Sequence, residues 1–514
     1  MQYAVTAAEM KLYDQKTISE IGIPSLVLME RAALETVRVL LAERKEIKRV
    51  LIVSGTGNNG GDGLAVGRIL ASRGVKVSFL LAGKWEKLSK ETALQKDILL
   101  NSGFSILRKM ENEEYNIVID ALFGIGLSRD VEGEYAELIH AINALKNRGS
   151  YICSLDIPSG ICADTGKVMG CAVRADLTTA FAFAKRGELL YPGREYTGKL
   201  VVCDIGIPTV VLENQYPEAA CLERKDVIRK LPVRRPDGNK GTFGKVLLIA
   251  GSRDMCGACI LAGSSAFKAG AGMVKIITPE CNREILQSTL PETMLYSYSD
   301  MPEPEQLREA LDWTDIVAIG PGLGTGEAAC FLVRYFLENS VIPMVLDADA
   351  LNLIGRDQEL AKLLADKNGE NIVLTPHPGE LVRLLEADVA SYRKDRMEMI
   401  RKVLQKYGCI LVAKDAVTIV AGKNRREQLI NTSGNDGMAV AGSGDVLTGI
   451  ISGLMAQKMP CFEAAGLGVF LHGLAGEEAC RSNGRYGMMA MDIVKQLPKV
   501  MGAKADTKGR TEEE

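Results

Sequence analysis

Short apolar runs alternate with helical stretches along most of the chain, which is the pattern of a parallel α/β protein. In the first half, the runs that predict buried strands are Val50–Ser54, Val75–Leu81, Ile117–Asp120, Tyr151–Asp156, Leu177–Ala182 and Leu200–Asp204. In the second half they are Lys245–Ala250, Met273–Thr278, Ile316–Ile319, Met344–Asp347, Ile372–Thr375, Ile410–Ala413 and Val417–Ala421. The pattern therefore predicts two α/β halves.

The two series are separated by a polar stretch that begins near Leu212 and reads Glu-Asn-Gln-Tyr-Pro-Glu. Linkers between domains are typically polar and proline-bearing, so we expect the boundary within roughly 210–225. A length of 514 residues also exceeds what one hydrophobic core usually serves. The last residues, Ala503–Glu514, are polar and are predicted to be frayed.

Composition and charge narrow the class of protein. Hydrophobic residues make up 47% and charged residues 25%, as in an ordinary globular protein, and the formal net charge is −3. There is no basic excess of the kind that indicates nucleic-acid binding. Five charged residues among the first twenty interrupt any signal core, and no apolar run approaches the roughly 18 residues that span a bilayer. The 12 scattered cysteines favour free thiols in a reducing compartment. We therefore expect a cytoplasmic protein that binds neither nucleic acid nor membrane.

A glycine-dense loop follows the first strand of the first half. Gly55-Thr-Gly57-Asn-Asn-Gly60 satisfies the dinucleotide fingerprint G-x-G-x-x-G and precedes a helical pattern. That fingerprint expects an acidic residue about 20 positions later, but the strand there ends in Leu-Leu-Ala-Gly. A hydride-transferring dehydrogenase is therefore disfavoured, and a tight turn with a purely structural role is the plain alternative.

Two further strands end beside polar residues. One runs through Asp120 into Ala-Leu-Phe-Gly-Ile-Gly, and the other through Asp156 into Ile-Pro-Ser-Gly. Because the carboxyl ends of parallel strands face a common crevice, Asn59, Asp62 and Ser159 should join these two aspartates. A single strand-terminal aspartate is more often a helix cap, but three such strand ends favour a binding site.

These motifs, together with Leu28-Met-Glu-Arg-Ala-Ala33, resemble the NAD(P)H-hydrate epimerase family over roughly residues 1–215. The resemblance implies that the hydrated dinucleotide contacts Asn58, Asn59, Gly60, Gly61, Asp62, Gly124, Ile125, Gly126, Leu127, Ser128, Arg129, Asp130 and Asp156. It also implies a potassium ion at Asn59, Asp120 and Ser159, whose oxygen atoms suit a hard cation. Asp156 is the expected acid/base group, with Lys185 as its partner; the alternative for Lys185 is a surface lysine.

In the second half, the most informative segment is Gly442-Ser-Gly444-Asp445, which precedes apolar residues at helical spacing. Free amides at a helix N-terminus form an anion site, and an aspartate there can accept a hydroxyl proton during phosphoryl transfer. Helix capping by Ser443 or Asp445 is the alternative. The motif resembles the ribokinase-like fold.

Several other segments of the second half accompany this motif. They are Gly320-Pro-Gly-Leu-Gly324, Thr375-Pro-His-Pro-Gly-Glu380, Lys414-Asp-Ala-Val-Thr418 and Ala269-Gly-Ala-Gly272. Together these segments resemble the ADP-dependent NAD(P)H-hydrate dehydratase family over roughly 225–500. The resemblance implies that the hydrated cofactor contacts Ala271, Gly322, His377 and Asp445. It places the nucleotide at Lys414, Asp415, Ala416, Val417, Thr418 and Gly444.

Two residues depart from the dehydratase family's pattern. Asp436 stands where proline is usual and Asp415 where glycine is usual, so both add negative charge near a nucleotide.

Two further features have structural alternatives. A lone histidine such as His377 is often structural, and Cys256-Gly-Ala-Cys259 reads as a small-residue helix start more than as a redox pair.

The sequence thus predicts a Rossmann-like doubly wound domain (1–215, epimerase) followed by a ribokinase-like α/β domain (225–502, dehydratase). Such an enzyme would interconvert the R and S hydrates of NADH and NADPH and dehydrate the S form with ADP, releasing AMP and phosphate. The expected cofactors are K⁺ in the first domain and Mg²⁺ with ADP, and we expect a homo-oligomer. The alternatives are a vitamin or sugar kinase fused to a nucleotide-binding regulatory domain, and a first domain that only binds nucleotide. The preference between NADH and NADPH hydrates, and the use of ATP in place of ADP, stay open.

Overall fold

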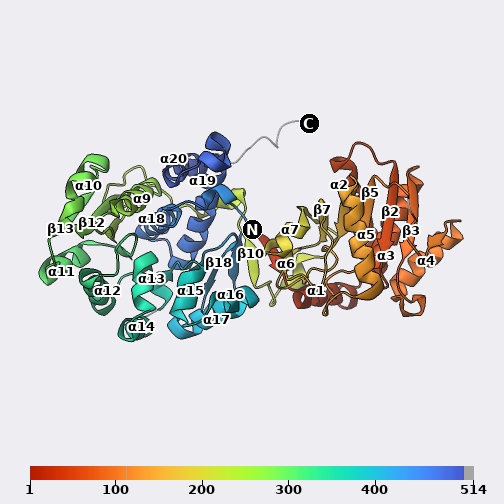
Figure 1. Cartoon of the computed structure of the whole chain (residues 1–514), viewed down its shortest axis with the longest axis horizontal. Helices are drawn as coiled ribbons and strands as arrows, with labels where there is room; N and C mark the ends of the chain where they lie inside the picture. The colour runs from red at the N-terminus through yellow and green to blue at the C-terminus, as the bar shows by residue number, and fades with distance from the viewer. Residues whose placement is uncertain (112, 368, 503–514) are drawn as a thin grey trace. The chain divides into compact units, whose positions relative to one another are not determined.

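The structure, a computed structural model, describes residues 1–502 except 112 and 368. The tail that was predicted to be frayed, 503–514, lies outside the described residues. The chain forms two compact units, one comprising Gln2–Ala219 and the other everything from Ala220 onward together with Met1 (Figure 1).

The first unit is built on a seven-stranded parallel sheet with the order β4-β3-β2-β5-β6-β7-β9. The strands are β2 (Arg49–Ser54), β3 (Lys76–Leu81), β4 (Ile106–Leu107), β5 (Ile117–Ala121), β6 (Tyr151–Leu155), β7 (Leu177–Phe181) and β9 (Lys199–Cys203). From β2 the chain adds β3 and then β4 on one side. It then returns to the other side of β2 and adds β5, β6, β7 and β9 in that order. This order is that of a doubly wound sheet, so the predicted Rossmann-like fold is confirmed.

Helices cover both faces of this sheet, which explains why its strands are apolar throughout. They are α1 (Ala7–Ser19), α2 (Ser25–Glu43), α3 (Asn58–Ser72), α4 (Lys90–Asn101), α5 (Gly133–Asn147), α6 (Arg186–Leu189) and α7 (Gly193–Thr197). Along β2, Val50 and Ile52 pack into the core beneath α2 and α3. Leu51 and Val53 point the other way, into the core beneath α5. A short parallel pair, β1 (Gln2–Val5) with β8 (Ala184–Lys185), lies beside the main sheet of this unit.

The sheet of the second unit has nine strands in the order β13-β12-β11-β14-β15-β16-β17-β18-β19. The strands are β11 (Lys245–Ile249), β12 (Met273–Pro279), β13 (Met294–Tyr298), β14 (Ile316–Ile319), β15 (Met344–Leu346), β16 (Ile372–Leu374), β17 (Ile410–Ala413), β18 (Thr418–Gly422) and β19 (Gln428–Asn431). All neighbours are parallel as far as β17, and β18 and β19 are antiparallel.

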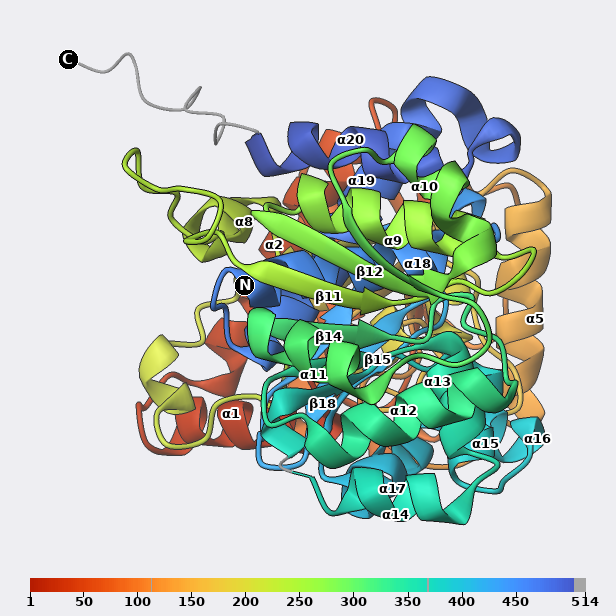
Figure 2. The same cartoon turned by 90° about the vertical axis from the view of Figure 1, so that its left-hand side faces the viewer.

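The helices of the second unit also form two layers (Figure 2). One layer contacts β11, β14, β15 and β16–β18 through α18 (Ser443–Ala456) and α19 (Cys461–Gly487), with α9 (Cys256–Lys268) and α20 (Ala490–Gly502) beside them. The opposite layer contains α11 (Pro304–Trp313), α12 (Glu327–Asn339), α13 (Ala348–Ile354), α14 (Gln358–Ala365), α15 (Pro378–Leu384), α16 (Val389–Lys394) and α17 (Arg396–Tyr407). Two further helices of this unit are α8 (Arg224–Lys230) and α10 (Arg283–Thr289).

Every strand predicted from the sequence is present, with ends that coincide or differ by one residue. The strands that the prediction missed are short or lie outside the sheet centres: β1, β4, β8, β10 (Ala219–Cys221), β13 and β19. All 12 cysteines lie in the described part of the chain and none forms a disulfide. Cys256 and Cys259 begin α9, as predicted. In the described residues, no helix is long and apolar enough to cross a membrane.

Candidate active sites

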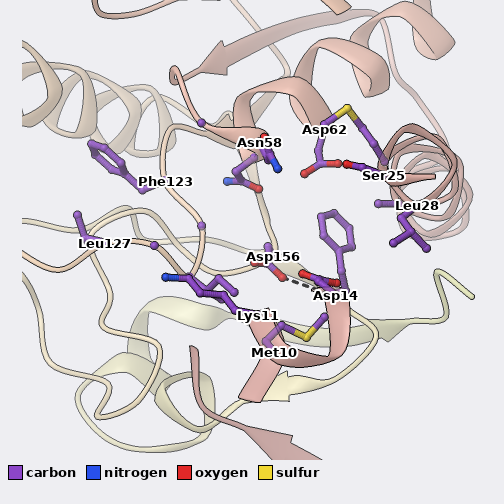
Figure 3. A pocket seen from close by; sticks show the side chains of 18 of the residues that line it. Met10, Lys11, Asp14, Ser25, Leu28, Asn58, Asp62, Phe123, Leu127 and Asp156 are labelled. Carbon is purple, nitrogen blue, oxygen red and sulfur yellow. Dashed lines mark hydrogen bonds between the residues drawn. The ribbon is translucent and has the colours of Figure 1, made fainter. Parts of the chain in front are cut away.

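The first unit contains a cavity of about 720 Å³ at the point where the strand order reverses, between β2 and β5. In a doubly wound sheet this is the place where ligands bind. Of the residues that the sequence assigns to the substrate, the cavity wall contains Asn58, Asn59, Asp62, Gly124, Ile125, Gly126, Leu127, Ser128, Arg129 and Asp156 (Figure 3). The structure therefore brings together segments that lie almost a hundred residues apart.

Three of the predicted substrate residues do not line the cavity: Gly60, Gly61 and Asp130. A Cβ atom at Gly60 would lie 2.0 Å from the carbonyl oxygen of Gly55, so this glycine lets the loop fold back on itself. A Cβ atom at Gly61 would meet the side chains of Met29 and Thr92. These two glycines shape the start of α3, whose first amides lack helical acceptors and suit an anion.

Asp156 lies at the end of β6 and forms an ion pair with Lys185. Its backbone has φ of 65°, a left-handed conformation that is uncommon for aspartate and clusters at functional sites. Lys185 is fully buried and also donates a hydrogen bond to the carbonyl oxygen of Phe181, at 3.2 Å. The interpretation of Lys185 as a surface lysine is therefore wrong.

Two more carboxyl groups face the cavity beside this ion pair, from Asp14 on α1 and Asp62 on α3 (Figure 3). Burial, and then the negative charge of Asp156, raise the pKa of Asp14 to about 7, although Lys185 acts in the opposite direction. Burial also raises the pKa of Asp62 well above its usual value, and Asp156 and Asp14 add to the shift. Asp14 can thus hold a proton near neutral pH.

Sequence reasoning missed Asp14, which entered only as one of the charges that exclude a signal peptide. A signal was present, because Asp14 is placed four residues after Met10 and three before Thr17, both buried. A charged residue on the buried face of an amphipathic helix points to a polar site rather than to solvent.

Of the three predicted potassium ligands, Asn59 lines the cavity, whereas Asp120 and Ser159 are buried and do not line it. Asp120 is buried; its carboxylate accepts hydrogen bonds from Ser154 Oγ at 2.7 Å and from Ser159 Oγ at 2.6 Å. Burial raises the pKa of Asp120. Asn59 is buried, and neither polar atom of its side-chain amide has a hydrogen-bond partner in the described residues. Gly124 lies against Asn59, and its neighbour Phe123 donates its N–H to Ser159, so one loop joins the three ligands.

In the second unit, α18 begins at Ser443 after Gly442, as predicted. Gly442 has φ of 87°, in the left-handed region that favours glycine. A Cβ atom at Gly444 would lie 3.2 Å from Nζ of Lys414, so the bare backbone lets the lysine approach the first turn of the helix. Ser443 is held by a hydrogen bond of 3.2 Å to Nε2 of His472.

Asp445 in this first turn lies close to an ion pair between the partly buried Lys414 and the buried Asp347. Lys414 Nζ donates to Asp347 Oδ1 at 2.7 Å, and Thr448 Oγ1 donates to Asp347 Oδ2 at 2.6 Å. Burial and the charge of Asp347 raise the pKa of Asp445 to about 7, while Lys414 opposes that shift. Among the described side chains, none forms an ion pair with Asp445. Sequence reasoning missed Asp347 and Thr448 as members of this site.

His377 follows β16 and caps α15. Its Nδ1 accepts the N–H of Gly379 at 3.0 Å, and its Nε2 lies 3.3 Å from a carboxylate oxygen of Glu380. Burial lowers the pKa of His377, and Lys414 lowers it further. Burial raises the pKa of Glu380 to about 7. His377 therefore has a structural role as a helix cap. Its contact with substrate stays a prediction.

Two other predicted substrate residues of this unit lie at different edges of the sheet. Gly322 lies in the loop after β14, at the carboxyl edge, with φ of 57°. A Cβ atom there would lie 2.8 Å from Ala258, at the start of α9. Ala271 precedes β12 and is buried at the amino edge, where Gly272 bonds to the carbonyl of Gly244. The structure does not bring Ala271 to the other residues.

The predicted nucleotide segment, Lys414–Thr418, joins β17 to the antiparallel β18 at the carboxyl edge. Asp415 in this segment accepts a hydrogen bond of 3.1 Å from the hydroxyl of Tyr392 and lies 3.8 Å from Arg396. Asp436 pairs with Arg485 at 3.2 Å. Both departures from the family pattern therefore have counterions within the chain, which reduces the negative charge that they present to a nucleotide.

Comparisons with known proteins match both units. A family model described as NAD(P)H-hydrate dehydratase matches residues 246–499, and one described as YjeF-related protein N-terminus matches residues 25–187. The bifunctional NAD(P)H-hydrate repair enzyme of Moorella thermoacetica is 38% identical, with 97% of this chain and 96% of the relative covered. The enzyme of the same name from Thermofilum pendens is 36% identical, with 96% and 95% covered.

A solved structure resembles the second unit. It is a ribokinase-like superfamily protein from Enterococcus faecalis V583, 29% identical with a TM-score of 0.50, and the match covers 56% of this chain and 98% of that one. The ribokinase-like fold predicted for the second half is confirmed.

Proposed function

Since this chain belongs to the family of bifunctional NAD(P)H-hydrate repair enzymes, we propose that it restores hydrated NADH and NADPH in two steps. The first unit would interconvert the R and S hydrates, and the second would dehydrate the S form with ADP, giving NAD(P)H, AMP and phosphate. The observation that carries the proposal is the pairing, on one chain, of a carboxyl-lined cavity with an aspartate in the first turn of α18.

For dehydration, we assign the base to Asp445. The hydroxyl oxygen of the hydrated ring would attack the terminal phosphorus of ADP, and its proton would pass to Asp445 as AMP leaves. The first amides of α18, with Lys414 beside Gly444, would hold the developing negative charge. Phosphate is a better leaving group than hydroxide. It would depart with help from the ring nitrogen's lone pair, and loss of the neighbouring ring proton would restore NAD(P)H.

For epimerisation, we assign acid/base chemistry at the hydroxyl-bearing carbon to Asp156, with Lys185 holding its carboxylate in place. The glycine-flanked start of α3 and the loop Gly124–Arg129 would bind the rest of the dinucleotide. A cavity of about 720 Å³ is large for a simple metabolite and suits part of a dinucleotide.

We also propose that Asn59, Asp120 and Ser159 hold K⁺. The unpaired side-chain oxygen of Asn59 supports this, since a buried polar atom without a partner is costly and a cation would satisfy that oxygen. The ion would supply positive charge beside the buried carboxylate of Asp120. Mg²⁺ would accompany the phosphates of ADP.

Further proposals concern the context of the enzyme. The functional division at 1–215 and 225–502 lies close to the division of the chain at Ala219 and Ala220. A cytoplasmic location fits the free thiols, and a net charge of −3 gives no attraction for nucleic acid or anionic membrane. We expect a homo-oligomer.

The test is to give the purified chain a mixture of both hydrates and to follow each by proton NMR, with and without ADP. We expect equilibration of the epimers without ADP, and complete conversion to NADH with ADP. A kinase fused to a regulatory domain would instead consume nucleotide with a vitamin or sugar and leave both hydrates unchanged. Conversion of one epimer only, with the other left behind, would remove the epimerase from the proposal. Replacing ADP by ATP in the same experiment would identify the phosphate donor.

A further inference from the structure

Three carboxyl groups meet at the wall of the first unit's cavity, and a fully buried ammonium group pairs with one of them. The cations Lys11 and Arg129 also line this cavity. Asp14 comes from α1, Asp62 from α3 and Asp156 from the end of β6, and their side chains point into the cavity from these three elements (Figure 3). The ammonium group is that of Lys185 on β8, and it forms its ion pair with Asp156. Among the described residues, no cation forms an ion pair with Asp14 or Asp62.

One ammonium cannot neutralise three neighbouring carboxylates, and like charges in a desolvated site cannot all ionise. The pairing with Lys185 selects Asp156 as the charged member. Asp14 then remains beside it as a carboxylic acid at neutral pH, in line with the pKa of about 7 that burial and Asp156 produce. The cavity thus offers a carboxylate and a carboxylic acid on different elements.

We propose that Asp14 is a second catalytic residue of the epimerase, the acid that complements Asp156. This inference rests on the proposed epimerase function. Exchange of configuration at a carbon that bears both a hydroxyl and a ring nitrogen requires the bond to oxygen to break and re-form on the other face. An acid must protonate the departing hydroxyl, and a base must take a proton from the incoming water.

The Asp14 carboxyl gives its proton to the hydroxyl, the carbon–oxygen bond breaks, and water leaves while the nitrogen lone pair forms a carbon–nitrogen double bond. Water then adds to the opposite face, the double-bond pair returns to nitrogen, and the released proton passes to Asp156. The substrate gains and loses one water and one proton, so no oxidant or further reactant is needed. Transfer of the proton from Asp156 back to Asp14 resets the site.

The test compares Asp14→Asn with the unchanged chain, under conditions where the latter epimerises the hydrates. We expect kcat for epimerisation to fall about 10²–10⁴-fold, the range for a positioned acid or base, with KM little changed. The unchanged chain should lose kcat as Asp14 ionises above neutral pH, whereas the variant should show no such fall. Asp97→Asn, an exposed carboxylate on α4, is the matched control and should behave as the unchanged chain.

Asp62→Asn decides between the two uncharged carboxyl groups. If that variant, and not Asp14→Asn, loses the alkaline fall in kcat, Asp62 is the acid and the proposal is wrong. Retention of more than about a tenth of kcat by Asp14→Asn would also overturn it. Circular dichroism of each variant checks folding; should Asp14→Asn not fold, Asp14→Glu, which keeps the acid but moves it, must show a reduced kcat with the alkaline fall retained.

Isotope labelling tests the bond that breaks. Epimerisation in water enriched in ¹⁸O should place the label in the new epimer, after correction for uncatalysed exchange. Retention of the original oxygen at full turnover would overturn the step as written. An unchanged chain that fails to epimerise at all would instead reject the proposed function, so the two failures are distinguishable.

Discussion

The two sites use the same parts in different ways. Each lies at the carboxyl ends of parallel strands, and each contains aspartates beside a lysine that forms an ion pair with one of them. In the first unit, Lys185 pairs with Asp156, the group that faces the cavity. In the second unit, Lys414 pairs with Asp347, and Asp445 is left without an ion pair in the described residues.

The choice of partner decides which carboxyl group can take up a proton. Because Lys414 keeps Asp347 in its charged form, burial and then the negative charge of Asp347 raise the pKa of Asp445 to about 7, although Lys414 itself acts in the opposite direction. Lys414 also lowers the pKa of Asp347. In the first unit the charged member is the proposed base itself, and the pKa values of its neighbours Asp14 and Asp62 are raised. Lys185 thus fixes the negative charge on the proposed reacting group, whereas Lys414 fixes it on an aspartate next to the proposed reacting group.

The largest effect that separates the sites is a double dissociation. Asp445→Asn should reduce ADP-dependent dehydration about 10²–10⁴-fold, because it removes the base, and leave epimerisation near its normal rate. Asp156→Asn should do the reverse, so that the R hydrate accumulates while the S hydrate is still repaired. The measurement is proton NMR of both hydrates, with circular dichroism as the folding control.

Two outcomes would contradict that prediction. If Asp445→Asn keeps more than about a tenth of the dehydration rate, Asp445 is not the base. If either variant loses both activities, the two active sites are coupled and do not act independently.

The pH dependence should run in opposite directions in the two units. Asp445 must be ionised to act as a base, so kcat/KM for dehydration should rise about tenfold between pH 6 and pH 8, around its pKa of about 7. Asp14 must be protonated to act as an acid, so kcat/KM for epimerisation should fall above its pKa of about 7. Initial rates, corrected for uncatalysed epimerisation, give both profiles, and parallel profiles would refute the contrast.

Potassium should distinguish the units by a smaller margin. Replacing K⁺ with a large organic cation at equal ionic strength should slow epimerisation several-fold, since Asn59, Asp120 and Ser159 would lose their ion. Asn59→Ala should reduce this dependence on K⁺. Equal rates and equal substrate affinity in both salts would remove the ion from the first site.

The smallest effect is expected on cutting the chain between the units. Each has its own sheet and core, so a fragment ending near residue 215 should fold and keep epimerase activity close to that of the full chain. Size-exclusion chromatography and the NMR assay would check this. A fragment that is soluble only when co-expressed with the remainder would show that the units depend on each other.

Much of both sites is local in sequence and was therefore predictable. The loops before α3 and α18 each contain glycines directly ahead of a helix whose apolar residues recur at helical spacing. Gly442 illustrates the reason: its left-handed backbone is a local requirement that only a few residue types meet. The strand-end residues Asp120 and Asp156 were found because parallel strands share one carboxyl edge.

What the prediction missed depends on contacts between distant segments. Asp14 and Asp156 are 142 positions apart, and no local pattern links a helix near the N-terminus to the end of β6. Nothing in the sequence around Lys185 distinguishes a buried lysine from a surface lysine. Ala271 lies at the amino edge of its sheet, although the segment that contains it resembles the dehydratase family.

The sequence by itself determined the two parallel α/β halves, the helix N-termini that suit a phosphate, and the aspartates at strand ends. Hydrophobic periodicity, the backbone freedom of glycine and strand direction are local properties of the chain. Only the tertiary structure decided which carboxyl group each lysine neutralises, and hence which one keeps its proton. Burial and charge–charge interaction act through space over a few ångströms, and only the folded chain sets those distances.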